Sequence, residues 1–201
     1  MKNKVIITIA RQFGSGGKEI GEKLSSRLEI PFYDKSIIHL AAQESGIDED
    51  LFQSADEKAL HTFWATTAGS TSIYGNRLSM FSEMPMNDKL FIIQSNIIKR
   101  LAEESCVIVG RCADYILREE KNIVSVFIHA DEESKKQRMI QTYEVPEKDA
   151  KEVMVKTDKK RAAYYNYYSG EKWGRADNYD LSINSGAIGI DGAVDLIIKF
   201  A

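Results

Sequence analysis

The chain has 201 residues, 43% of them hydrophobic and 28% charged, which is typical of a single globular domain and excludes a disordered or fibrous protein. Asp and Glu number 30 against 27 Lys and Arg, so the formal net charge of −3 lacks the basic excess that a dedicated nucleic-acid binder shows. The apolar run near the N-terminus breaks at Thr8, far short of the ~20 residues of a membrane span, and no signal-peptide pattern precedes it. The charge and the short apolar run lead us to expect neither a nucleic-acid nor a membrane partner. Only two cysteines occur, which is typical of a reduced compartment, so we expect a cytoplasmic protein.

The first elements in the chain are a strand, a glycine-rich turn and a helix. Residues 4–10 are apolar and rich in β-branched side chains, which is typical of a strand buried on both faces. Three glycines lie within residues 11–18, and apolar residues then recur at every fourth position from Ile20 to Leu28. That period predicts an amphipathic helix directly after the turn.

Strands and helices alternate along the rest of the chain. Further strands are expected at residues 31–34, 106–109, 123–128 and 179–184. Helices are expected at residues 34–46, 47–60, 87–101, from 131 onward, at about 146–168 as one broken helix or two, and at 189–199. Asp34 and either Asn87 or Asp88 are the side chains expected to cap two of these helices. The alternation predicts one α/β domain over residues 1–201, with a parallel sheet covered on both faces.

The glycine-rich turn has the residue types of a phosphate-binding loop. A Walker A loop reads G-x-x-x-x-G-K-[ST] between a strand and a helix, and Gly17 and Lys18 supply its G-K pair. Backbone amides and a lysine near a helix N-terminus attract phosphate, and Lys18 would bridge the β- and γ-phosphates of ATP. The candidate nucleotide-binding residues are Arg11, Gly14, Ser15, Gly16, Gly17, Lys18 and Glu19.

Two positions depart from that motif. Gln12 stands where the first glycine belongs, and Glu19 stands where the magnesium-binding Ser or Thr belongs. A glycine-rich turn without a ligand is therefore the alternative interpretation. Arg11 would either brace this loop or contact the nucleotide.

Four stretches of the chain resemble the cytidylate kinase-like family of P-loop nucleoside monophosphate kinases. They are residues 6–18 around the glycines, 31–35 (Pro-Phe-Tyr-Asp-Lys), 107–114 with a Gly-Arg pair, and 127–133. The resemblance implies a three-layer P-loop NTPase fold with a parallel sheet of about five strands. It also implies an acceptor-binding insert, at residues of about 47–86, and a basic lid over ATP, at about 138–168.

Charged residues at the strand ends are the candidates for the acceptor side. Ligands of open α/β sheets lie beyond the carboxyl ends of the strands, where Arg111 follows a strand. The resemblance implies that Arg111 meets the acceptor phosphate, and the alternative is a surface arginine paired with Asp114. Asp34 and Lys35 follow another strand, and Asp34 would hold magnesium through water, orient the acceptor, or only cap a helix.

The region of the expected lid carries the remaining cations. Phosphoryl transfer develops negative charge that Arg and Lys stabilise as water is expelled. Arg138, Lys160 and Arg161 are the candidates there, and a solvated helix face is the alternative for this charge run. The candidate catalytic residues are Lys18, Arg111, Arg138, Lys160 and Arg161.

The resemblance implies an ATP- and Mg²⁺-dependent transfer to a small acceptor, most simply a nucleoside monophosphate such as CMP or dCMP. In cytidylate kinases Ser follows the strand-end Asp, and Asp follows the Gly-Arg pair, whereas Lys35 and Cys112 stand at these positions here. The donor half of the site is thus better matched than the acceptor half. A nucleotide-binding regulatory module without transfer activity, and a kinase for another small molecule, remain as alternatives.

Overall fold

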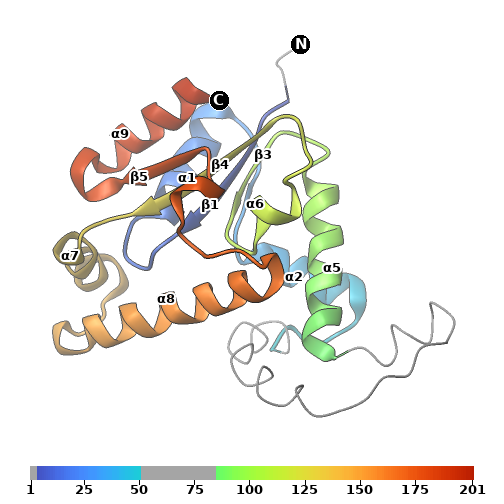
Figure 1. The fold of residues 1–201 in the computed structure, drawn as a ribbon, viewed down its shortest axis with the longest axis horizontal. Helices are drawn as coiled ribbons and strands as arrows, with labels where there is room; N and C mark the ends of the chain where they lie inside the picture. Colours follow the sequence, from blue (N-terminus) through green and yellow to red (C-terminus); the bar gives the residue numbers. More distant parts are fainter. Residues whose placement is uncertain (1–3, 51–84) are drawn as a thin grey trace, which may run out of the picture.

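The computed structural model describes residues 4–50 and 85–201, which contain a five-stranded, all-parallel sheet of order β2-β3-β1-β4-β5 (Figure 1). The strands are β1 (Ile6–Arg11), β2 (Phe32–Tyr33), β3 (Cys106–Val109), β4 (Ile123–His129) and β5 (Leu181–Asn184). The central strand β1 pairs with β3 on one side and β4 on the other. The predicted α/β fold with a parallel sheet of about five strands is confirmed.

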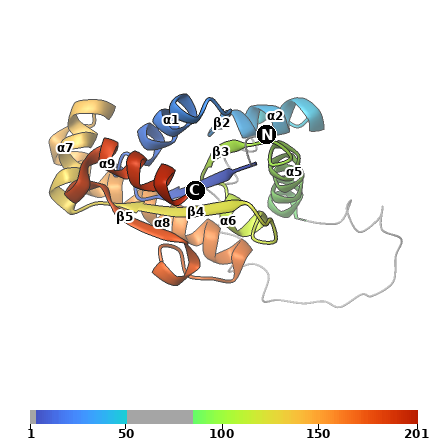
Figure 2. The same ribbon diagram turned by 90° about the horizontal axis from the view of Figure 1, so that it is seen from above.

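Helices cover both faces of the sheet (Figure 2). They are α1 (Gly17–Leu28), α2 (Ser36–Ser45), α5 (Met86–Leu101), α6 (Ala113–Ile116), α7 (Glu132–Tyr143), α8 (Glu147–Ser169) and α9 (Ser185–Phe200), with a short 3-10 helix, η1 (Ala176–Asn178). Helices α1 and α9 pack on one face, and α2, α5 and α6 on the other. Within residues 4–50 and 85–201, no helix is both long and apolar enough to span a membrane.

The central strand β1 contributes to two separate hydrophobic cores because successive side chains of a strand point to opposite faces. In β1, Ile7 and Ile9 belong to the core under α1 and α9, whereas Ile6 belongs to the core under α2 and α5. All three are essentially buried. Burial on both faces is why β1 reads as a continuous apolar run.

Three sequence-based expectations about helices need correction or comment. The segment at about 146–168, expected as one broken helix or two, is a single unbroken helix, α8. Neither Asn87 nor Asp88 caps α5, because the helix already begins at Met86, after Pro85. Proline suits this position because its fixed φ is compatible with a helix start and it has no N–H to satisfy. The expected insert at about 47–86 lies almost wholly outside the described residues.

Two helices and two turns lie at the carboxyl edge of the sheet. Helix α8 runs along this edge, and α7 lies beside it (Figure 1). The turn after β1 leads into α1, and the turn after β3 leads into α6. Open α/β sheets bind ligands beyond this edge, so the fold places the site there.

Candidate active site

The glycine-rich turn forms a tight loop between β1 and α1. Gly14 and Gly16 have φ values of 78° and 77°, in the left-handed region that favours glycine. A Cβ on Gly14 would lie 2.8 Å from the Lys135 carbonyl oxygen, and one on Gly16 would lie 3.2 Å from the Arg138 guanidinium carbon. The loop is therefore packed closely against α7, and α1 begins directly after Gly16.

Lys18 is placed differently from the lysine of the motif it was matched to. It is the second residue of α1, its side chain is 52% exposed, and its Nζ lies 3.6 Å from a Glu22 carboxylate oxygen. The Arg11 side chain packs against the loop through its carbon atoms, since a Cβ on Gly17 would lie 2.6 Å from the Arg11 Cβ. Its guanidinium lies beside Gly110 and Asp34, at the cavity.

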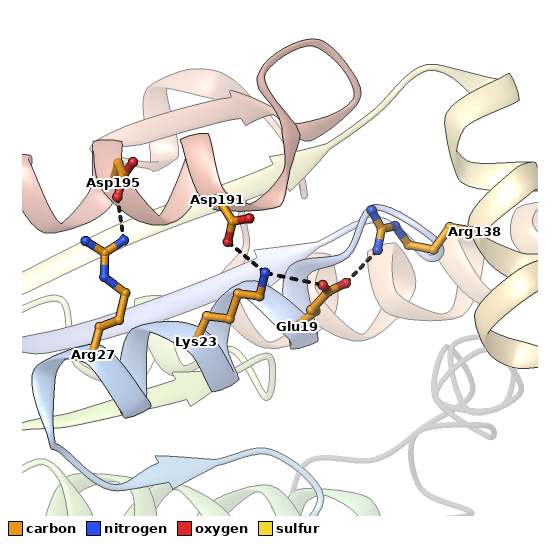
Figure 3. A network of polar contacts seen from close by, with 6 residues as sticks. All are labelled: Glu19, Lys23, Arg27, Arg138, Asp191 and Asp195. Carbon is orange, nitrogen blue, oxygen red and sulfur yellow. Dashed lines mark hydrogen bonds and ion pairs between the residues drawn. The ribbon is translucent and has the colours of Figure 1, made fainter.

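Glu19 and Arg138, which were predicted as a nucleotide contact and a catalytic residue, contact each other. Arg138 Nη1 lies 2.6 Å from Glu19 Oε2, and Lys23 Nζ lies 3.8 Å from Glu19 Oε1 (Figure 3). Lys23 also donates to Asp191 at 2.7 Å, so a chain of ion pairs ties α7, α1 and α9 together (Figure 3). The Glu19 carboxylate holds Arg138 next to Gly16.

Two side chains of helix α8 hydrogen-bond to the backbone of the glycine-rich loop. The Phe13 backbone N–H donates to Asp158 Oδ1 at 2.7 Å, and Arg161 Nη1 donates to the Arg11 carbonyl oxygen at 3.0 Å. Burial raises the pKa of Asp158, and the Phe13 amide and Arg161 partly offset that shift. A carboxylate thus accepts a hydrogen bond from one amide of the loop predicted to bind phosphate.

Gln12, at the position where the Walker A motif has a glycine, contacts Lys135 of α7. Its Oε1 accepts a hydrogen bond from Lys135 Nζ at 3.1 Å, and it also lies 3.4 Å from the Ala130 backbone nitrogen. Lys135 is buried, and a buried ammonium needs polar partners. The departure from the motif therefore supplies a contact between the loop and α7.

A cavity of about 430 Å³ lies at the carboxyl ends of β1 and β3, against α8. Six of the predicted site residues line it: Arg11, Asp34, Lys35, Arg111, Lys160 and Arg161. Lys18, Glu19, Arg138 and the loop residues Gly14, Ser15, Gly16 and Gly17 are not among its lining residues. The structure thus brings Arg11, the expected acceptor residues and two of the three expected lid residues together, whereas Arg138 and the other expected donor residues do not line the cavity.

Asp34 belongs to this cavity and does not cap α2. Arg11 Nη2 lies 3.5 Å from Asp34 Oδ1, and both side chains are mostly buried. The N-cap of α2 is Lys35, and no side chain makes a capping hydrogen bond there. The interpretation of Asp34 as a plain N-cap is therefore wrong, because its carboxylate turns toward Arg11.

The turn after β3 has an unusual backbone. Gly110, Arg111 and Cys112 have φ values of 81°, 59° and 53°, so three consecutive residues are left-handed. For non-glycine residues this conformation costs about 1–2 kcal/mol each. Strain of this kind clusters at functional sites, where the surrounding structure maintains it. The turn places Arg111 in the cavity and starts α6, a helix that the sequence did not predict.

Sequence reasoning also missed cavity residues that come from distant segments. Asp114 of α6, Thr157, Tyr164 and Tyr165 of α8, and Trp173 all line the cavity. Asp114 is 8% exposed, and burial raises its pKa to about 6. The only signal for Asp114 in the sequence is its closeness to the Gly-Arg pair.

The cavity differs in charge from the whole chain. Five Lys and Arg residues and three Asp and Glu residues line it, a formal excess of two positive charges, whereas the whole chain carries −3. A concave site lined by one sign of charge focuses the electrostatic field and attracts ligands of the opposite sign. The arrangement therefore suits a small anion.

Comparisons with family models and with solved structures both found matches to this chain. A family model described as the cytidylate kinase-like family matches residues 6–187. A crystal structure of an uncharacterized protein from Eubacterium ventriosum is 33% identical, with a TM-score of 0.71 and coverage of 98% of both chains.

More distant solved structures share the fold. A gluconokinase from Sinorhizobium meliloti has 15% identity and a TM-score of 0.55, covering 98% of this chain and 93% of its own. A shikimate kinase from Bacteroides thetaiotaomicron has 12% identity and a TM-score of 0.51, covering 98% and 97%. No curated protein matches the chain.

Proposed function

This chain belongs to the cytidylate kinase-like family, and we propose that it transfers the γ-phosphoryl group of ATP to a small anionic acceptor. The observation that carries the proposal is the cationic cavity, which adjoins a glycine-rich strand–loop–helix turn through Arg11. Phosphoryl transfer relies on positioning and on stabilising charge, and both can be supplied without a protein nucleophile.

On the donor side, ATP phosphates would bind at the amides of residues 13–17 and the N-terminus of α1. Lys18 and Arg138 lie at this helix end, and each would exchange its present carboxylate partner for phosphate oxygens. Mg²⁺ usually binds through one or two carboxylates together with substrate phosphates, so the lack of a three-ligand cluster among the described residues is compatible with it. Asp34, beside Arg11, is the carboxylate that would hold Mg²⁺, whose charge would offset that of the phosphates.

On the acceptor side, Arg111, Lys160 and Arg161 would neutralise the acceptor anion and the transferring group. An acceptor oxygen would attack the γ-phosphorus while the bond to the bridging oxygen of ADP breaks. Donors aimed at developing charge lower the barrier most when water is excluded. Arg161 is already partly covered, since its guanidinium lies 5.6 Å from the Phe13 ring centroid.

We propose CMP or dCMP as the first acceptors to test, on the strength of the family. A second candidate is a kinase for another small anion, favoured by Lys35 and Cys112 at positions where cytidylate kinases have Ser and Asp. The structural neighbours include proteins named as gluconokinase and shikimate kinase, so gluconate and shikimate belong in the same assay. A regulatory nucleotide-binding module is the third candidate, favoured by the carboxylates of Glu19 and Asp158 at the loop.

The test is ADP release from ATP over a panel of nucleoside monophosphates, gluconate and shikimate. We expect acceptor-dependent turnover that is lost in Arg111→Ala and retained in Arg27→Ala, a matched control whose arginine pairs with Asp195 away from the cavity. ATP binding without turnover on any acceptor would favour the regulatory module. Absence of ATP binding would refute both interpretations.

A further inference from the structure

One oxygen of a buried carboxyl group in the cavity wall lacks a hydrogen-bond partner. Asp114 is 8% exposed and lines the cavity, yet its buried Oδ2 has no partner. Buried polar atoms in native proteins are nearly always paired, so an exception needs an explanation. Because Asp114 lines the cavity, a donor on a bound ligand is a candidate partner for this oxygen.

The surroundings of Asp114 contain further polar groups. Burial raises the pKa of Asp114, and the Tyr165 hydroxyl and nearby backbone amides partly offset that shift. With a pKa of about 6 the group is largely ionised at neutral pH, and an ionised carboxylate only accepts hydrogen bonds. The hydroxyl of Tyr179 is also buried nearby, and its ring centroid lies 6.4 Å from that of Tyr165.

The backbone holds Asp114 and Arg111 in one strained unit. Both belong to the left-handed turn and the short helix α6 that follow β3, and both line the same cavity. An anion that meets Arg111 is therefore also brought near the Asp114 carboxylate. A plain anion, without a donor, would leave that carboxylate desolvated and unpaired.

We propose that Asp114 determines acceptor specificity by accepting a hydrogen bond from a hydroxyl or amino group of the acceptor. The cavity then selects small anions that also carry such a donor, and it rejects analogues that lack it. This inference rests on the proposed function, because it assigns the cavity to the acceptor. A site built to pair with a substrate hydroxyl or amine discriminates strongly against analogues without that group.

The test uses the full chain with Asp114→Asn, which keeps the shape but places a donor where an acceptor was. Asp195→Asn, on α9 and outside the cavity, is the matched control for loss of one carboxylate. Phosphorylation and calorimetric binding are measured for CMP against UMP, dCMP and dideoxy-CMP, and for gluconate against 2-deoxygluconate. These pairs separate an amino donor from a hydroxyl donor.

For the wild-type chain we expect at least about a tenfold preference for the acceptor that carries the donor, in kcat/KM or in binding. Asp114→Asn should reduce that preference to about twofold or less, chiefly through KM, and Asp195→Asn should keep it. Thermal melting checks that both variants fold.

The outcomes separate this inference from the proposed function. If an acceptor is phosphorylated and Asp114→Asn keeps the full preference, Asp114 has only a structural role, for example with a buried water, and the inference is overturned. If a donor-bearing anion binds selectively through Asp114 but is not phosphorylated, the proposed transfer fails and the inference holds. If no member of the panel binds or reacts, both are overturned.

Discussion

The glycine-rich loop and the cavity at the carboxyl edge are built from neighbouring segments, but their polar groups differ in whether the protein itself supplies their partners. At the loop, protein carboxylates contact the groups that phosphate would need: Glu19 pairs with Arg138, and Asp158 accepts from the Phe13 amide. In the cavity, cations outnumber acids and a buried carboxyl oxygen lacks a partner. At the loop, protein carboxylates therefore occupy the donors that a phosphate would use, whereas in the cavity one carboxyl oxygen has no protein partner.

The largest effect should come from the cavity. Arg111→Ala should lower kcat/KM about 10²–10³-fold, the usual cost of losing one group that stabilises developing charge. Alanine keeps the same left-handed backbone strain as arginine, so the melting temperature serves as the check that the variant folds. Steady-state kinetics and thermal melting measure the two effects, and a variant that unfolds without losing specific activity would contradict the assignment.

The next effect concerns stability and pH. The pKa of Asp114 is raised from 3.8 to about 6, so the folded state binds more protons between these values and becomes less stable as pH rises from about 4 to about 6. A rise of this size corresponds to about 3 kcal/mol at neutral pH. Asp114→Asn removes the titration, so it should raise the free energy of unfolding at pH 7 and change it little at pH 4.

Denaturant unfolding at the two pH values measures this difference. Asp195→Asn, an exposed carboxylate on α9, should show no such pH-dependent gain. A variant that is more stable but less selective would show that the carboxylate is kept for function at the expense of stability. Equal stability at both pH values would mean that the carboxyl is better paired than the structure shows.

A smaller effect should distinguish the two cations near the loop. Arg11 contacts Asp34 and lies against Gly17, whereas Lys18 is half exposed and paired with Glu22. We expect Arg11→Ala to reduce kcat/KM about tenfold more than Lys18→Ala, because buried charge interactions are screened less by solvent. The reverse order, measured in the same assay, would show that Lys18 leaves Glu22 and moves to the nucleotide.

The smallest effect should come from Glu19. Glu19→Gln keeps the shape but no longer neutralises Arg138, so KM for ATP should fall about twofold to fivefold, as befits a partly exposed ion pair. Lys23 retains Asp191, which preserves the link between α1 and α9. A rise in KM would instead mean that Glu19 itself serves the nucleotide.

Sequence patterns predicted the sheet well, since β1, β3 and β4 are short β-branched runs that parallel sheets bury on both faces. They could not predict α6, because Arg111 and Cys112 adopt left-handed conformations that carry no residue signal. Nor could they predict that Asp114 is buried beside Tyr165, about fifty positions later in the chain. The Gly-Lys pair was visible, but the pattern does not show that Lys18 pairs with Glu22 on the surface of α1.

The close approach of Gly110 to Arg11 has an evolutionary consequence. A Cβ on Gly110 would collide with the Arg11 guanidinium, so the turn after β3 has room for this arginine only while position 110 remains a glycine. The two positions lie about one hundred residues apart in the chain, and a larger residue at position 110 would displace Arg11. Relatives of this chain that keep Arg11 should therefore also keep Gly110.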